Sequence, residues 1–169
     1  MRKTLNGLVV FAGLTVFVLA AVARADEEKV PLDKVPKAVL DGVKARFPDA
    51  TLVSAEKEKE GDKTTYEIAI KNKDQKIEVT LTPDGKIVEM ENEIAAKDMP
   101  KVVMKALETK YPQATYKLVE EVIKVKDGEE KLEYYEVLLV TAEKKKLEVL
   151  VSPKGKITKV EDKSKEKDE

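Results

Sequence analysis

The 169-residue chain contains no cysteine and no histidine, and each absence excludes a class of chemistry. Without cysteine there is no disulfide, so the folded part must be held together by its hydrophobic core alone. The chain also lacks the imidazole base of a serine or cysteine triad, and the thiolate and imidazole ligands that zinc usually takes. Triad hydrolases and zinc proteins are therefore excluded.

A strong excess of charge of one sign is also missing. The 32 lysine and arginine residues nearly balance the 33 aspartate and glutamate residues, and both signs alternate along the chain. Aromatic residues make up only 5% of the sequence, and none is interleaved with a basic patch. These features argue against nucleic acid as a partner.

The longest apolar run stands near the N-terminus, after a short basic region. It extends from Leu8 to Val22, about 15 residues, which is shorter than the roughly 20 needed to span a bilayer. The sequence Ala23-Arg24-Ala25 that follows has the small-x-small pattern of a signal peptidase site. We expect residues 1–25 to be a signal peptide cut after Ala25, giving a periplasmic or secreted protein with no membrane attachment. An uncleaved N-terminal anchor is the alternative.

The mature chain would comprise residues 26–169, with 29 basic and 33 acidic side chains and a net charge of −4. Its 144 residues suit one domain or two very small ones.

The mature sequence contains one pattern twice. Six of the seven prolines form three equivalent pairs, and four of the five glycines after residue 25 form two. Proline and glycine fix backbone geometry, so their recurrence indicates that the same turns recur. The offset grows from 64 to 70 residues, mostly at Asp127–Lys131. The equivalent segments are Val35–Leu40 with Met99–Met104, Phe47–Thr51 with Tyr111–Thr115, Ile77–Val79 with Leu147–Val149, and Thr82–Ile87 with Ser152–Ile157.

Each copy is predicted to begin with a helix. Pro36 and Pro100 suit the first helical position, where the missing N–H has no intrahelical partner in any case. Apolar residues then recur four apart on one face, and Pro48 and Pro112 disfavour helix in the residue before them. The helical stripes are Val39, Val43 and Phe47 in the first copy, and Val103, Leu107 and Tyr111 in the second.

Four strands are predicted after each helix. Apolar and polar residues alternate, as in Tyr66, Ile68 and Ile70 around Glu67, and the connections have hairpin length. We predict an α+β fold of two tandem αββββ units, each a helix packed on a four-stranded antiparallel meander, together forming one compact body. The units span residues 30–93 and 94–161, and the charged residues 162–169 are expected to be a disordered tail.

Several of these segments resemble a known family. They are Val35–Val39, Phe47–Ala50, Tyr66–Ile68 and Pro83–Lys86, with their second-copy partners. The chain resembles the PepSY-like, beta-lactamase-inhibitor-like domains of bacterial envelope proteins over roughly residues 30–161. The resemblance implies a helix on an antiparallel sheet in each unit. Relatives include protein inhibitors of hydrolases and domains of peptidase propeptides, and the family brings no catalytic residues.

Acidic residues are the remaining candidates for chemistry. Glu120 and Glu121 are expected on a solvated strand among lysines, where nothing would separate their pKa values as catalysis requires. The Asp84-Gly85 pair corresponds to Lys154-Gly155 in the second copy, which favours a turn over a calcium loop. We therefore expect no enzyme, no catalytic or cofactor-binding residue, no cofactor and no metal site.

The second copy departs from the first on the outward face of its sheet. Tyr134, Leu138, Val140 and Leu150 stand where the first copy is mostly polar, and they form a candidate protein-binding patch. Either another part of the chain covers this face, or an exposed apolar patch docks a protein or a second copy of the chain.

The sequence thus favours an exported, non-enzymatic protein that binds a protein partner and regulates or inhibits a secreted hydrolase. The alternative is a module that binds a small ligand or an envelope surface in the groove between the repeats. A charged, concave groove would favour that alternative.

Overall fold

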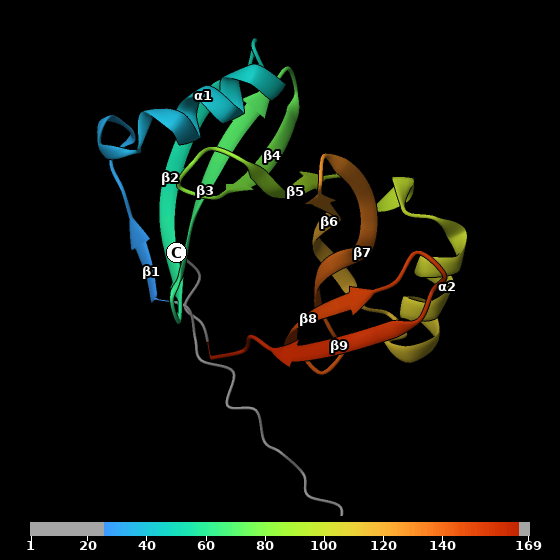
Figure 1. Cartoon of the computed structure of the whole chain (residues 1–169). Helices are drawn as coiled ribbons and strands as arrows, with labels where there is room; N and C mark the ends of the chain where they lie inside the picture. The colour runs from blue at the N-terminus through green and yellow to red at the C-terminus, as the bar shows by residue number, and fades with distance from the viewer. Residues whose placement is uncertain (1–25, 166–169) are drawn as a thin grey trace, which may run out of the picture.

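The computed structural model describes residues 26–165, with side chains from Glu28 onward. All strands form one antiparallel sheet whose order follows the chain from β1 to β9 (Figure 1). The strands are β1 (Asp26–Lys29), β2 (Thr51–Glu60), β3 (Lys63–Asn72), β4 (Gln75–Leu81), β5 (Ile87–Glu93), β6 (Thr115–Lys126), β7 (Glu129–Val140), β8 (Lys146–Val151) and β9 (Ile157–Asp162). The helices are α1 (Lys37–Arg46) and α2 (Lys101–Lys110), each preceded by a short 3-10 turn, η1 (Leu32–Lys34) and η2 (Ala96–Asp98).

The α+β class and the presence of two repeats agree with the sequence prediction, and in each repeat a helix is followed by four strands. The repeats are joined by pairing between β5 and β6, where Glu91 lies opposite Val122. The strand β1 was not predicted, and it adds an edge by pairing with β2.

The expected boundaries differ at the C-terminal end. Asp162, predicted to begin the tail, is the last residue of β9, and Lys163 forms an ion pair with Glu148 at 3.2 Å. The predicted signal peptide and residues 166–169 lie outside the described part of the chain.

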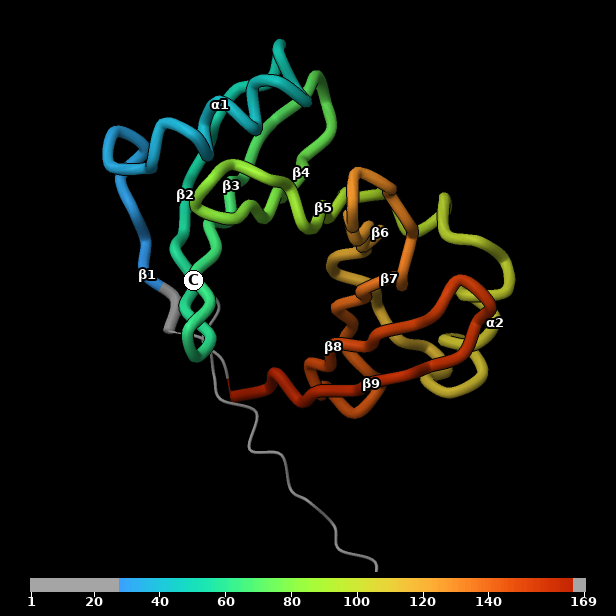
Figure 2. The backbone as a smooth tube through the Cα atoms, in the orientation of Figure 1, coloured from blue at the N-terminus to red at the C-terminus, as the bar shows by residue number. Residues whose placement is uncertain are grey.

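Both helices pack on the same face of the sheet. Figure 2 shows the sheet as a curved band with α1 and α2 on its outer side. Pro36 and Pro100 take the N-cap position instead of the predicted first helical position, so each helix begins one residue later than predicted. The chain leaves helical geometry at Phe47 and Tyr111, as expected for a residue before proline. The predicted stripes are buried against strand residues such as Ile68 and Val149, except that Tyr111 is only partly buried.

The tight turn after β4 lies directly beneath α1. Gly85 has φ +84°, and a Cβ at this position would overlap the carbonyl oxygen of Ala38. Gly155 repeats the arrangement with φ +78° and would place a Cβ 2.7 Å from the carbonyl oxygen of Val102 in α2. The recurring glycine therefore allows the helix and the turn to approach closely, in addition to forming the turn.

The longer first hairpin of the second copy extends over the first. The strands β6 and β7 have 12 residues each, against 10 in β2 and β3. Ile123 and Val125 of β6 pack against the first core, and Glu130 at the hairpin tip forms an ion pair with Arg46 of α1 at 3.3 Å. The segment in which the two copies differ thus contributes to their junction.

Candidate functional site

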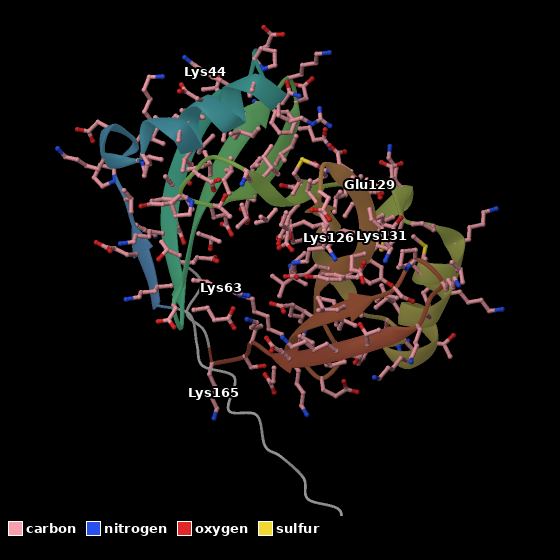
Figure 3. All side chains as sticks on the ribbon, in the orientation of Figure 1. Lys44, Lys63, Lys126, Glu129, Lys131 and Lys165 are labelled. Atoms are coloured by element: carbon pink, nitrogen blue, oxygen red, sulfur yellow. The ribbon has the colours of Figure 1, made fainter. Side chains whose placement is uncertain are left out.

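The sheet face opposite the helices is lined by glutamates. In each strand these residues alternate with core residues, so they project away from α1 and α2. Side chains project from both halves of the curved sheet toward the space that the sheet partly encloses (Figure 3). We call this surface the acidic face; its glutamates are Glu56, Glu58, Glu67, Glu78, Glu89, Glu91, Glu93, Glu120, Glu136, Glu148 and Glu161.

Strand pairing places several of these glutamates directly opposite one another. Glu78 lies opposite Glu91, and Glu120 lies opposite Glu93 on one side and Glu136 on the other. Like charges at directly opposed positions destabilise a sheet. An arrangement that costs stability in this way is more typical of a functional surface than of a structural one.

The centre of the acidic face combines close approach with burial. One carboxylate oxygen from each of Glu78, Glu91 and Glu120 lies within 4.8 Å of the other two. Glu120 is only 7% exposed. Within residues 26–165, no hydrogen bond or ion pair of a cationic side chain reaches these three glutamates.

Burial and mutual repulsion raise the pKa values of the central glutamates. Burial is the largest cause in each case, followed by neighbouring glutamates. The pKa rises to about 9 for Glu67, about 8 for Glu120 and about 7 for Glu91 and Glu136. Burial also raises the pKa of Glu78, although a hydrogen bond with the Glu67 carboxyl group acts in the opposite direction. Part of the centre is therefore protonated at neutral pH.

Lysines neutralise the periphery of the acidic face. Lys76 lies 3.2 Å from Glu93, and Lys124 pairs with Glu89. Together with the Lys163–Glu148 pair, these contacts leave the carboxyl groups without a cationic partner concentrated at the centre.

The four residues of the predicted patch all lie on this face and are half-buried. Leu138 lies opposite Leu118 and Glu148, while Leu150 lies opposite Glu136. Glutamates therefore separate the apolar residues, and the predicted continuous apolar patch is an amphipathic surface.

Tyr134 and Val140 lie at opposite ends of the same row on β7. Tyr134 lies opposite the fully buried Val122, and burial raises the pKa of its hydroxyl group to about 12. Val140 lies opposite Thr115 and Lys146, away from the central glutamates.

Two depressions lie side by side on the acidic face and share Leu118 and Glu120. The first is completed by Glu136, Leu138, Lys146, Glu148 and Lys163. The second is completed by Lys76, Ile77, Glu78 and Glu93. Glu120 therefore lies between two hollows, each of which offers both carboxylate and aliphatic groups.

The sequence prediction for Glu120 was wrong. It was placed on a solvated strand, whereas it lies among the glutamates of three neighbouring strands. The turn at Pro83–Gly85 could have placed Glu78 opposite Glu91, because a hairpin turn fixes register. The approach of Glu120 depends on the β5–β6 pairing, which has no local signature.

These features can be compared with known proteins. The model of the beta-lactamase-inhibitor-like, PepSY-like family matches residues 22–89 and again residues 82–159. The chain belongs to this family. The double match also agrees with the internal repeat, and the family's description is inhibitor-like rather than catalytic. Among proteins with curated descriptions, none matches this sequence.

Solved structures of Bacteroides proteins share the fold of this PepSY-like protein. A BLIP-like protein of Bacteroides fragilis is 18% identical, with a TM-score of 0.58, over 78% of this chain and 89% of that one. A DUF2874 family protein of Bacteroides uniformis is 15% identical, with a TM-score of 0.64, over 78% and 92%. A protein of Bacteroides eggerthii described as periplasmic is 16% identical, with a TM-score of 0.64, over 77% and 90%. Within residues 26–165, no helix is long and apolar enough to cross a bilayer.

Proposed function

We propose that this PepSY-like protein is an exported, non-catalytic binding protein whose acidic face holds a basic segment of a protein partner. The observation that carries the proposal is the group of glutamates at the centre of a concave sheet face with no cationic partner among the described residues. A lysine- or arginine-rich loop would supply the missing positive charge. Complementary charge of this kind favours the correct partner and speeds its association.

The apolar residues among the glutamates fit the same kind of partner. Leu138 and Leu150 offer aliphatic surface beside Glu136, and Tyr134 offers an aromatic ring at the end of the row. Long basic side chains carry an aliphatic stem and a charged head, so they can use both kinds of contact. The inhibitor-like description of the family supports a secreted hydrolase as the partner, restrained by occupation of its surface.

Native co-purification from the envelope fraction, in the presence of a chelator, tests this proposal. The Glu67→Gln, Glu136→Gln double variant should lose the partner that the unmodified protein retains. A Glu108→Gln, Glu143→Gln variant is the matched control, because it replaces the same number of carboxyl groups at exposed positions outside the acidic face. The recovered protein should be a hydrolase whose activity falls when the purified protein is added. Equal recovery with both variants would contradict the proposed binding face.

The non-catalytic part of the proposal has its own test. The raised pKa values of Glu67 and Glu78 resemble those of acid catalysts, so burial alone does not distinguish binding from catalysis. The purified protein should not hydrolyse glycoside, ester or peptide substrates. Turnover that disappears in Glu67→Gln would contradict the non-catalytic role.

A small cationic ligand is the second candidate, favoured by the charge and concavity of the face. The hollow between Glu120, Glu136 and Leu138 offers carboxylates beside an aliphatic wall, to which a polyamine could bind in competition with Lys146 and Lys163 at its rim. Calorimetric titration with spermidine and with a lysine-rich peptide separates the candidates. Tighter binding of spermidine would favour the small ligand. An anionic envelope surface is disfavoured, because the face would repel it.

A further inference from the structure

We propose that Glu78, Glu91 and Glu120 together bind one calcium ion at the centre of the acidic face. The three residues come from β4, β5 and β6, so the ion would lie across the junction of the two repeats. This inference goes beyond the proposed function and does not depend on it, since the ion requires only these three side chains.

The geometry fits the size of the ion. Oxygen ligands of calcium lie about 2.3–2.6 Å from the metal, so two ligands of one ion are separated by at most about 5 Å. The three carboxylate oxygens lie within 4.8 Å of one another, which is inside this limit. A single ion placed among them can therefore contact all three with little movement of the backbone.

The state of Glu120 is a second and independent observation. Its side chain is more than nine-tenths buried and points into the group formed by Glu78 and Glu91. Within the described residues, no hydrogen bond or ion pair compensates its charge, and its neighbours across the sheet are the glutamates Glu93 and Glu136. A buried carboxylate without a partner is costly unless it is protonated or coordinates a metal.

Lysines surround the centre without forming an ion pair with Glu78, Glu91 or Glu120 among the described residues. Lys146 and Lys163 line the hollow beside Glu120, and Lys163 is paired with Glu148 at 3.2 Å. Lys76 is already paired with Glu93 at 3.2 Å, and Lys124 is paired with Glu89. The hollows beside Glu120 are open to solvent. Water can therefore complete the six to eight ligands that calcium takes.

The chemistry of the ligands selects calcium among common divalent cations. Magnesium demands near-ideal octahedral geometry, keeps several of its waters and is usually held by only one or two carboxylates, whereas calcium accepts several carboxylates in flexible geometry. A group of three carboxylates therefore suits calcium better than magnesium. Zinc prefers nitrogen and sulfur ligands, and the chain has neither histidine nor cysteine.

Calcium titration of the chelator-treated mature protein tests the proposal. At pH 8, where deprotonation of Glu78, Glu91 and Glu120 is favoured over neutral pH, calorimetry should show one ion bound per chain. Millimolar calcium should raise the unfolding temperature by about 5 °C or more, and magnesium at the same concentration should raise it by less than half as much.

Variants of single glutamates identify the ligands. Glu120→Gln should fold, because it removes an uncompensated buried charge, and it should abolish both the binding heat and the temperature shift. Glu91→Gln should weaken binding at least tenfold. Glu56→Gln is the matched control, since this residue shares the acidic face but lies on β2, opposite Glu67 and outside the group of three, and it should retain binding within about threefold.

Two results would overturn the proposal. One is that the folded protein binds no calcium at about 10 mM calcium, which is about ten times the concentration used in the unfolding experiment. The other is an equal loss of binding in Glu56→Gln and Glu120→Gln, which would indicate general attraction to the acidic face. Neither result would bear on capture of a basic protein segment, which is tested in a chelator with Glu67 and Glu136 variants.

Discussion

At the scale of single residues, glycine and glutamate have distinct roles in this protein. Gly85 and Gly155 occur where a turn with positive φ meets the backbone of a helix. The glutamates of the acidic face occupy strand positions that would be polar and solvated in an ordinary sheet. The first set stabilises the fold, whereas the second carries the chemistry of the surface.

The close approach at Gly85 leads to a prediction about stability. Gly85→Ala should lower the free energy of unfolding by at least about 2 kcal/mol, because the methyl group meets the carbonyl of Ala38 and φ is +84°. Gly61→Ala is the matched control: its φ is +59°, but nothing lies within 4 Å of the added Cβ. It should cost about 1 kcal/mol. Urea denaturation measures the free energy of unfolding of both variants. Equal losses in the two would contradict a role for the contact between Gly85 and the helix.

Two adjacent leucines distinguish the acidic face from the core. Leu139 is fully buried beneath α2, whereas Leu138 is half-buried on the acidic face. Leu139→Ala should cost about 2–5 kcal/mol of unfolding free energy, and Leu138→Ala about 1 kcal/mol. Chemical denaturation measures both variants. Comparable losses would show that Leu138 belongs to the core and would remove it from the proposed binding surface.

At the scale of elements, much of the fold could be predicted from residues close in sequence. Prolines delimit α1 and α2, and alternation identifies the strands that follow. The turn at Pro83–Gly85 was predicted as a turn, but its contact with the helix was not. That contact depends on packing between segments that are about 40 residues apart.

The arrangement of the acidic face could not be predicted in the same way. The sequence placed Tyr134, Leu138, Val140 and Leu150 on the outward face, and they do lie there. It did not predict that Glu120 would be buried, because this follows from the pairing of β5 with β6 and from the curvature of the sheet. Neither has a short-range sequence signature.

At the scale of the whole molecule, the acidic face makes stability depend on pH. The folded state holds protons on Glu67, Glu91, Glu120 and Glu136 at pH values where the unfolded chain has lost them. Stability is therefore greatest near pH 5 and falls as pH rises toward about 9. Exposed acids with lowered pKa, such as Asp84 and Glu133, change the stability only at pH values below their ordinary pKa. They therefore do not affect the dependence between pH 5 and pH 9.

Thermal unfolding between pH 5 and pH 9 checks this dependence. In the presence of a chelator, the unfolding temperature should fall by several degrees across the range. The decrease should be smaller in Glu67→Gln, which lacks the carboxyl group with the highest pKa. A constant or rising temperature would contradict the burial of these glutamates.

The whole surface depends on one property, the presence of buried carboxyl groups without cationic partners at the centre of the sheet. Carbon-13 NMR titration of the glutamate carboxyl groups in the chelator-treated mature protein measures this property directly. Glu67 should titrate near pH 9 and Glu120 near pH 8, well above the ordinary value of 4.5. Midpoints near 4.5 for both residues would show that their carboxylates are solvated or already paired, and the acidic face would then have no unmet demand for a cation.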